Sequence, residues 1–460
     1  MGEKKISNLK ETKLKHHTRR LSIKDGIFWS ARVSFGDNYL APFAIASGMS
    51  NSLVAIINSI WKLSSVGQML GSERLKNHNR KKLISRSLLI ESLGWLMIFI
   101  TSLLYLENFS KIIITTSMIV GLIVIVLSNG MQYPAWFSMM GDVVDEKFRG
   151  RWWGKRTTII SFTTIIFSII SAFAINYLEK IHLKIIGLSL FFLIAFSARL
   201  ICRKIRNKQY DPKSKIKKSK LSLKEFVKNL PKTNFGKFTI YRSLFGMAMG
   251  MTASLVPIYL LRNLGLNYLH YILIILSGTI FSVITLNLWG KLADKFGNYK
   301  IITITSSLMV FTPILWVISS NIYCLFIIPG LIGGTAWRAF LLVSKNFIYD
   351  NIKIEERAKT VSYYNLFIGI STFIGGIIGS ILIKIIHTEW IKPIIFIFFI
   401  GALLRIIIAI FWIPKIQESR KNLKFINKTK FQNLLIKQIK PTFIEDLHEI
   451  EALPQYLKEK

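Results

Sequence analysis

The sequence predicts an all-α integral membrane protein with twelve transmembrane helices in two six-helix bundles. Three observations lead to this fold class. Of the 460 residues, 51% are hydrophobic, and the mean hydropathy is +0.42. Charged residues make up only 18% of the chain, below the ~25% of ordinary soluble domains. Several uncharged runs are at least about 18 residues long, enough to cross a bilayer. This composition excludes a disordered chain, a collagen-like repeat and a disulfide scaffold.

The uncharged runs locate the individual spans. Residues 112–141 and 301–337 contain no Asp, Glu, Lys or Arg. The second run is too long for one helix, and Ser319-Ser320-Asn321 in its middle predicts a short turn between two spans. The predicted spans are 26–47, 51–71, 83–105, 112–140, 156–178, 184–202, 238–262, 267–290, 300–318, 321–348, 358–384 and 392–414.

The connecting segments alternate in charge, which predicts the orientation. Of the 61 Lys and Arg residues, 49 fall on one set of segments, six on the opposite set and six within spans. By the positive-inside rule the 49 face the cytoplasm, so both termini are expected there. The net charge of +37 then needs no nucleic-acid partner, because the bilayer explains it. A multi-pass protein of the cell membrane is expected, without a cleavable signal peptide.

The basic stretch 203–237 divides the chain six spans by six. Together with the predicted spans, this stretch divides the chain into five predicted segments. They are a cytoplasmic N-terminal tail over 1–26, a six-helix bundle over 27–202, a cytoplasmic linker over 203–237, a second six-helix bundle over 238–414 and a cytoplasmic C-terminal tail over 415–460. Residues 31–36 (ARVSFG) and 241–246 (YRSLFG) lie at matching places in the first and seventh spans. Such internal similarity predicts two homologous halves flanking a site near the bilayer midplane.

A motif lies between the predicted eighth and ninth spans, where residues 290–300 read GKLADKFGNYK. It resembles the inner-loop signature of the major facilitator superfamily of secondary transporters, G-x-L-a-D-r-x-G-r-[k/r], with Asn298 as a departure. Its place on a short basic loop in a 6+6 chain makes the resemblance specific, and it covers about residues 26–414. The resemblance implies that superfamily's fold, a monomer and a small-molecule substrate.

The resemblance also implies a cytoplasmic gate. The carboxylate of Asp294 would meet arginines at the start of the fifth span, helped by a helix dipole. Glycines would let the backbones approach closely. The expected gate residues are Gly290, Asp294, Gly297, Arg149, Arg151 and Arg156.

Other features depart from the superfamily's patterns. The first-half copy of the signature, residues 71–81, has Leu75 in place of Asp and His78 in place of Gly. The fifth span lacks the Gly/Pro pattern of drug–proton antiporters, and the fourth lacks their usual Arg. These absences disfavour multidrug efflux and favour uptake by symport, while efflux stays open.

Four ionisable residues lie at membrane depth in the first three spans, where charges are costly and are functional candidates. By depth, Asp37 can meet Lys62, and Arg32 can meet Glu91. Asp37 or Glu91 is a candidate proton-coupling carboxylate. The alternative is a static ion-pair network, because an unpaired charge there costs several kcal/mol, roughly.

The resemblance places spans 1, 4, 7 and 10 around a substrate cavity. Arg338 would face it and suits an anionic substrate group, or else contacts lipid phosphate. Arg242 is expected to reach the inner surface, and Arg405 to be structural. Amides and aromatics suit small polar solutes but also helix packing. The other expected cavity residues are Asn38, Tyr39, Asn129, Gln132, Tyr133, Trp136 and Trp337.

These features together predict a secondary active transporter of a small solute, working by alternating access and coupled to protons. A transporter-like receptor or scaffold is the alternative. An enzyme is disfavoured because no Ser–His pair or His/Cys/Asp/Glu cluster lies at depth. No catalytic, cofactor or metal site is expected, and Cys202 and Cys324 are predicted to be buried thiols. No P-loop motif points to an ATP-driven pump.

Overall fold

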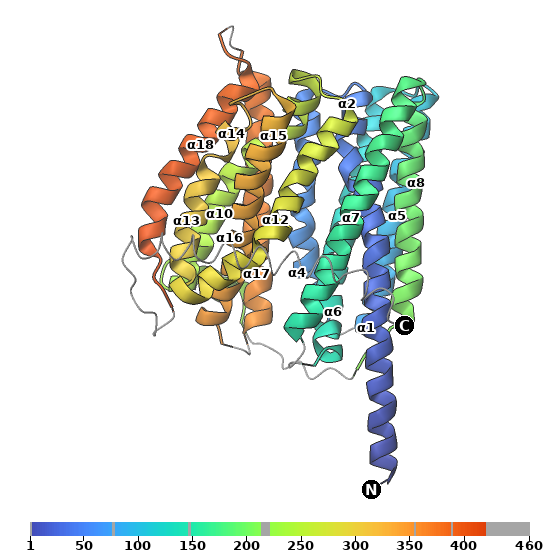
Figure 1. Ribbon diagram of the computed structural model, residues 1–460, viewed down its shortest axis with the longest axis vertical. Helices are drawn as coiled ribbons and strands as arrows, with labels where there is room; N and C mark the ends of the chain where they lie inside the picture. Colours follow the sequence, from blue (N-terminus) through green and yellow to red (C-terminus); the bar gives the residue numbers. More distant parts are fainter. Residues whose placement is uncertain are drawn as a thin grey trace. The chain divides into compact units, whose positions relative to one another are not determined.

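The computed structural model describes residues 2–75, 79–145, 149–212, 221–353, 356–387 and 390–419. Every regular element in these ranges is a helix, which confirms the all-α fold class (Figure 1). Within these ranges, ten helices are long and apolar enough to cross a membrane. They are Asn51–Arg74, Arg80–Leu106, Lys111–Val143, Trp152–Lys180, Lys184–Asn207, Asn234–Asn263, Tyr268–Thr285, Ile322–Asn351, Lys359–Ile385 and Pro393–Lys415.

The first and ninth predicted spans are broken helices. The first consists of the end of α1 (Gly2–Phe35), the 3-10 turn η1 (Asp37–Tyr39) and α2 (Leu40–Ala46). Gly36 stands at the break, where Trp95 leaves no room for a Cβ. The ninth consists of α13 (Asn298–Val310) and α14 (Thr312–Leu315), with Pro313 at the start of α14. With these two, the helices agree with the twelve predicted positions.

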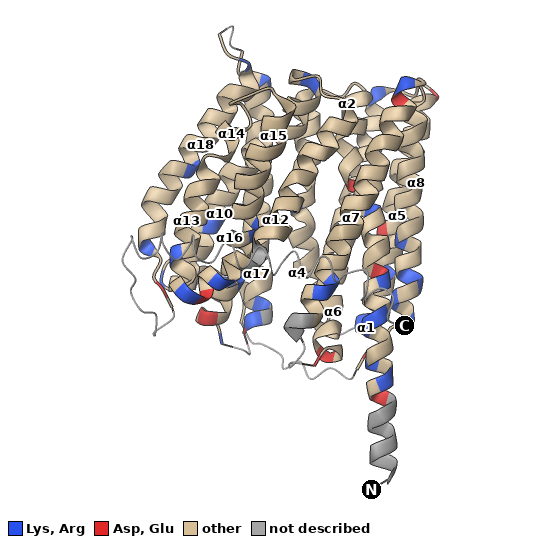
Figure 2. Cartoon of the chain, viewed as in Figure 1, with Lys and Arg blue, Asp and Glu red and all other residues tan. Residues whose placement is uncertain are grey.

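The described residues fall into two compact units. Unit 1 comprises those within 1–223, 242–273 and 358–401, and unit 2 those within 224–241, 274–357 and 402–460. The predicted division at 203–237 into two six-helix bundles stays a prediction. In both units the middle stretches of the helices carry few charged residues (Figure 2).

Unit 1 holds most of the described helices. Besides α1, η1 and α2, they are α3 (Asn51–Ile60), η2 (Trp61–Leu63), α4 (Ser64–Arg74), α5 (Arg80–Leu106), α6 (Lys111–Val143), α7 (Arg149–Lys180), α8 (Lys184–Asn207), most of α10 (Asn234–Ala253), α11 (Val256–Ile258), η4 (Tyr259–Asn263), α17 (Arg357–Ile385) and the start of α18 (Pro393–Trp412).

Unit 2 contains α9 (Leu223–Asn229) and most of α12 (Tyr268–Phe296) as well as α13 and α14. It also contains α15 (Ile322–Ile328), the π-helical segment η5 (Pro329–Gly334), α16 (Thr335–Asn351), the end of α18 and the 3-10 turn η6 (Ile413–Lys415).

Hydroxyl groups join α1 to α7 at regular steps. The Ser30 hydroxyl donates to the Ile160 carbonyl, and four residues later the Ser34 hydroxyl donates to the Thr164 carbonyl, both at 3.1 Å. A spacing of four keeps these residues on one helical face, so the two helices run together over several turns. This contact fixes the position of α1, which carries several of the charged residues described next.

Candidate functional site

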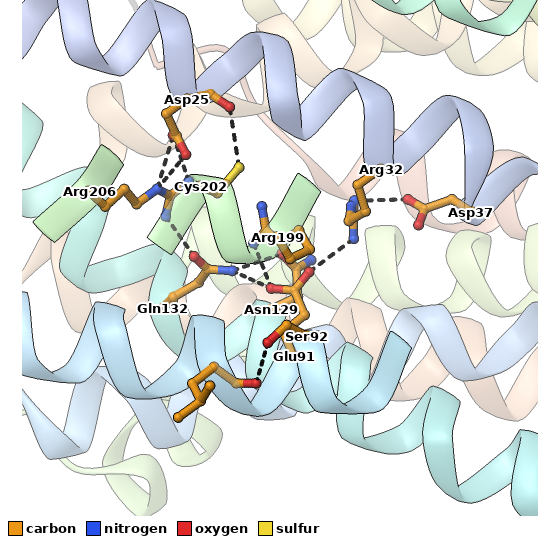
Figure 3. A network of polar contacts seen from close by, with 11 residues as sticks. Asp25, Arg32, Asp37, Glu91, Ser92, Asn129, Gln132, Arg199, Cys202 and Arg206 are labelled. Carbon is orange, nitrogen blue, oxygen red and sulfur yellow. Dashed lines mark hydrogen bonds and ion pairs between the residues drawn. The ribbon is translucent and has the colours of Figure 1, made fainter. Parts of the chain in front are cut away.

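Buried ion pairs link α1 to α5 inside unit 1 (Figure 3). Arg32 in α1 contacts two carboxylates: its Nη2 lies 2.8 Å from Asp37 Oδ2, and its Nη1 lies 3.3 Å from Glu91 Oε1 in α5. The side chains of Arg32 and Glu91 are only 2% and 0% exposed. The predicted Arg32–Glu91 contact is therefore present.

Glu91 uses both carboxylate oxygens. Besides the Arg32 contact at Oε1, its Oε2 accepts from Arg199 Nη2 at 2.6 Å and from Gln132 Nε2 at 2.7 Å. Arg199, in α8, is fully buried. Charge-assisted hydrogen bonds of this kind are stronger than neutral ones. Glu91 therefore acts as the fixed counterion of two arginines.

The network continues along α8 (Figure 3). Arg206 donates from Nη1 to Gln132 Oε1 at 2.6 Å, and from Nε to the two Asp25 oxygens at 3.0 and 2.9 Å. The Cys202 thiol donates to the Asp25 carbonyl at 3.5 Å. Gln132 therefore bridges the Glu91 and Asp25 groups, because its amide contacts one member of each.

Asp37 differs from the other carboxylates in this network. Its side chain is 20% exposed, and only Oδ2 is bound, by Arg32. Oδ1 is buried and has no hydrogen-bond partner within the described part of the chain. A proton can therefore bind at Oδ1 without displacing an existing hydrogen bond, which is not true of either oxygen of Glu91.

The predicted pairing of Asp37 with Lys62 is wrong. The break at Gly36 places Asp37 in η1, from which its carboxylate contacts Arg32 instead. Lys62 has an exposed side chain and no ion-pair partner among the residues that the structure describes. Its face of the helix is occupied by Asn58, one turn before, and Ser65, one turn after. These residues contact α10 and α17, as described below, so Lys62 faces those helices and not Asp37.

Tryptophans flank the arginines of the network. The Arg32 guanidinium lies 5.6 Å from the ring centres of both Trp29 and Trp61. Trp136 lies between Arg206, at 5.4 Å, and Arg156, at 4.6 Å. A cation over an aromatic face is stabilised by roughly 1–2 kcal/mol when desolvated. The rings therefore help to hold these cations away from water.

Two residues that were expected to line the cavity, Asn38 and Tyr39, hydrogen-bond to α7. Asn38 Nδ2 donates to Ser168 Oγ at 3.2 Å, and the buried Tyr39 hydroxyl donates to Ser171 Oγ at 3.0 Å. Both contacts extend the hydroxyl series between α1 and α7. The expected role of Asn38 and Tyr39 in substrate binding stays a prediction, and helix packing accounts for their present contacts.

The other expected cavity residues divide between the two units. In α6, Asn129 accepts from Gln132 Nε2 at 3.3 Å, and Tyr133 is 46% exposed. In unit 2, Trp337 lies stacked on Phe340 with ring centres 6.5 Å apart. Its neighbour Arg338 is exposed. Within the described residues, no group of His, Cys, Asp and Glu has a geometry that could hold a metal ion.

The sequence profile of the Major Facilitator Superfamily matches residues 27–337 and 238–447 of this chain. The chain belongs to the major facilitator superfamily. It is thus a multi-pass membrane transporter and not an enzyme. A curated relative is the proton-coupled antiporter flippase LtaA of Staphylococcus saprophyticus, which is 22% identical over 333 residues, 70% of this chain and 77% of LtaA.

Solved structures of transporters show the same superfamily fold. The nucleoside transporter NupG aligns with a TM-score of 0.65 at 12% identity, over 88% of this chain and 100% of its own. A bacterial homologue of the iron transporter ferroportin, in an inward-facing state, aligns with a TM-score of 0.67 at 13% identity, over 86% and 98%. The POT family transporter PepTSo aligns with a TM-score of 0.64 at 11% identity, over 86% of this chain and 97% of its own.

The superfamily signature has the expected helical context. Gly290 and the exposed Asp294 lie in α12, and Gly297 separates α12 from α13 with φ +87°. This left-handed backbone favours glycine over residues that carry a Cβ. The left-handed backbone at Gly297 therefore explains why the signature has a glycine at this second position.

The arginine side of the predicted gate lies in α7 of unit 1. The side chains of Arg149 and Arg151 are outside the described residues. Arg156 Nε donates to the Ser22 carbonyl at 3.3 Å and to its hydroxyl at 3.2 Å. This contact holds α7 against α1. A gate contact between these arginines and Asp294 stays a prediction.

Five members of the network were missed in the sequence, although a signal was present. Asp25, Trp29 and Arg32 recur at helical spacing on α1, and Arg199, Cys202 and Arg206 do so on α8. Two such stripes predict two facing helices, on which Asp25 and Arg206 carry opposite charges. The missed residues are Asp25, Trp29, Trp61, Arg199 and Arg206. Arg242, expected at the inner surface, is instead only 4% exposed.

Proposed function

We propose that this superfamily member is a proton-coupled secondary transporter of a small solute, and that Asp37 carries the coupling proton. The observation that supports this choice is the contrast between Asp37 and Glu91. Asp37 is partly exposed and has one buried oxygen, Oδ1, without a described partner, whereas each Glu91 oxygen is bonded to a cation. We therefore assign the proton to Asp37, which is the most exposed of the three network carboxylates Asp25, Asp37 and Glu91.

Because Asp37 is paired with Arg32, protonation of Asp37 changes the ion pairs of Arg32. Asp37 and Glu91 together balance Arg32 and Arg199, which makes the group neutral when both acids are ionised. Protonation of Asp37 removes the negative partner of Arg32 and leaves one net positive charge. Arg32 then has Glu91 as its remaining counterion. We propose that this shift of Arg32 changes the preference between inward- and outward-facing states.

The direction of coupled transport has two candidates. The missing antiporter signals in the fourth and fifth spans favour uptake by symport. The staphylococcal relative is, by its name, a proton-coupled antiporter. Both directions use a carboxylate that is protonated in one access state and ionised in the other. For either direction, Asn129 and Tyr133 in unit 1 remain proposed substrate-contacting residues, as do Trp337 and Arg338 in unit 2.

The proposed setting is the cell membrane, with both termini in the cytoplasm and one chain as the working unit. The support is the distribution of Lys and Arg, 49 of which fall on one set of connecting segments. Labelling of single introduced cysteines at residues 24 and 182 from outside intact cells tests this orientation. Modification at 24 but not at 182 would contradict it.

Flux into proteoliposomes across an imposed pH gradient tests the coupling. The solutes are a panel of sugars, organic anions and cationic dyes, with the gradient applied in either direction. Wild type is expected to concentrate at least one solute only when the gradient is present. Asp37→Asn is expected to keep downhill flux of that solute and to lose the dependence on the gradient.

The matched control is Asp145→Asn, which makes the same change at an exposed carboxylate after α6. It is expected to behave as wild type. If Asp37→Asn accumulates the solute with unchanged gradient dependence, Asp37 is a structural acid and the coupling proposal is wrong. Saturable flux for no member of the panel would favour the receptor or scaffold alternative.

A further inference from the structure

Lys62 is a basic side chain that the carboxylates of the network do not pair. It lies midway along the helical span Asn51–Arg74. The carboxylates of Asp25, Asp37 and Glu91 are all bonded to arginines, and no ion-pair partner of Lys62 is found among the described residues. A charge at this depth is costly and marks a functional position by default. The side chain is nevertheless exposed, so it borders open space.

The surroundings of Lys62 show that this space is not on the lipid side of α4. Asn58 Nδ2, one turn before, donates to the Ser254 carbonyl just after α10, at 3.0 Å. Ser65, one turn after, packs against Gly369 of α17, together with the carbonyl of Lys62 itself. Residues at these spacings share a helical face, so Lys62 faces α10 and α17.

A second cation approaches the same turn of α17. Gly246 in α10 packs so tightly on α17 that an added Cβ would contact the Thr372 hydroxyl and, at 3.5 Å, a guanidinium nitrogen of Arg242. The backbone of Lys62 and the guanidinium of Arg242, on separate helices, therefore both lie beside residues 368–372 of α17 within unit 1.

The interface between α4 and α17 is polar on the C-terminal side of Lys62. Asn365 Nδ2 donates to Gln68 Oε1 at 3.0 Å, and the hydroxyls of Ser72 and Ser362 are 3.2 Å apart. A solute that binds at Lys62 therefore has polar groups beside it along α4. An apolar packing surface would not need these amides and hydroxyls.

We propose that Lys62 and Arg242 form an anion subsite on the transport path, and that its ligand is the phosphate group of the transported solute. This proposal rests on the transporter function and adds the substrate class. Two nearby cations best match a group with two negative charges, and a phosphate monoester carries about −1.5 to −2 at neutral pH. Arginine supplies a forked donor and lysine a mobile point charge for the same oxygens.

Ligand-induced thermal stabilisation of the purified full-length protein in detergent tests the subsite, because a ligand that binds only the folded protein stabilises it by RT ln(1 + L/Kd), where L is the free ligand concentration, so the rise in unfolding temperature with concentration reports the Kd. The probes are inorganic phosphate and glycerol 3-phosphate, with sodium chloride at matched ionic strength as the reference. Wild type is expected to be stabilised by both phosphates beyond the chloride effect. Lys62→Gln and Arg242→Gln are each expected to weaken the apparent Kd by about 10- to 100-fold, as for the loss of one charged hydrogen bond.

Three further variants make the result specific. Lys111→Gln removes the same charge at the exposed start of α6 and is expected to bind as wild type. Lys62→Arg keeps the charge and is expected to retain binding within a few fold, even if Lys62→Gln proves too unstable to assay. Asp37→Asn is expected to bind phosphate at least as tightly as wild type, so a failed coupling experiment leaves the subsite standing.

A further probe separates the two sources of a phosphate group. Dioctanoyl phosphatidic acid carries the same monoester on two acyl chains. If it binds more than tenfold tighter than glycerol 3-phosphate and loses affinity in Lys62→Gln, the ligand is a lipid headgroup. If both bind equally and both depend on Lys62, the ligand is a soluble phosphate ester. Phosphate affinity that is the same in Lys62→Gln as in wild type, or stabilisation by chloride equal to that by phosphate, overturns the proposal.

Discussion

Buried arginines in the two units have different kinds of hydrogen-bond partner. In unit 1, Arg32, Arg199 and Arg206 contact the carboxylates of Asp25, Asp37 and Glu91. In unit 2, the equally buried Arg405 of α18 donates from Nη1 to the Met309 carbonyl at 3.0 Å and to the Thr312 hydroxyl at 2.7 Å. The first kind of contact includes groups that can gain a proton. The acceptors of the second kind do not change charge.

This difference shows what each kind of buried arginine can do. An ion pair between Arg and a carboxylate can be switched, since protonation of the acid abolishes one of the two charges. An arginine solvated by a carbonyl and a hydroxyl at the break between α13 and α14 satisfies backbone groups that the broken helix leaves free. We therefore expect coupling residues in unit 1 and a structural role for Arg405.

Substitution of Glu91 should give the largest effect on this comparison. Glu91→Gln leaves Arg32 and Arg199 with one fewer buried counterion, and breaking a buried pair in this way costs about 3–5 kcal/mol. The expected result is a large fall in the unfolding temperature of the purified protein at a fixed heating rate. Glu107→Gln, at the exposed end of α5, is the matched control and should change stability by less than about 0.5 kcal/mol. Equal unfolding temperatures of Glu91→Gln and wild type would show that the ion-pair network does not stabilise the folded protein.

Substitution of Arg405 should give a smaller effect. Arg405→Met removes a buried cation together with its desolvation cost, and the neutral acceptors left behind lose about 1 kcal/mol of hydrogen bonding. The unfolding temperature should therefore move much less than in Glu91→Gln. The pH dependence of solute flux should match wild type, because no titrating group has changed. A shift in that pH dependence would place Arg405 in the coupling machinery and remove the contrast between the units.

Removal of an uncharged hydrogen bond should change the unfolding temperature least. Ser34→Ala removes one hydroxyl from the series between α1 and α7, and such bonds between membrane helices contribute about 0.6 kcal/mol on average. The control is Ser307→Ala on α13, whose exposed hydroxyl bonds only within its own helix. Thermal unfolding of both variants measures the difference. A loss as large as that of Glu91→Gln would mean that hydroxyl contacts, and not ion pairs, hold α1 in place.

The sequence predicted well how deep each charged residue lies in the membrane. It predicted poorly which neighbouring helix each side chain faces. Uncharged runs located the spans because each charge within a bilayer is costly, and residue counting placed Arg32 level with Glu91. The same counting placed Asp37 level with Lys62, but their side chains face different helices. The break at Gly36 and the 3-10 turn at Trp61–Leu63 change the angular position of every later residue, and hydropathy does not record that change.

The inner end of the network was missed for a different reason. Asp25 and Arg206 lie outside the apolar runs, so hydropathy assigns them to the tail 1–26 and the linker 203–237. In the structure α1 and α8 both extend beyond the apolar stretch, and Asp25 and Arg206 are 0% and 7% exposed. Their partners could have been found from the helical spacing of charges on the two segments. Hydropathy alone could not have found them, because it treats a paired charge as a free one.

The position of Cys202 gives the native chain an internal reporter. Its thiol is fully buried on α8, one turn from Arg199 and one turn from Arg206, and bonded to the carbonyl of Asp25. A thiol-specific reagent can reach it only while α1 and α8 are separated, so the rate of alkylation measures how often that pair opens. Cys324, which is partly exposed on α15, serves as the internal reference for reagent activity. The alkylation rate of Cys202 in the unmodified protein therefore measures how often α1 and α8 separate, which is the motion that a coupling proton would have to drive.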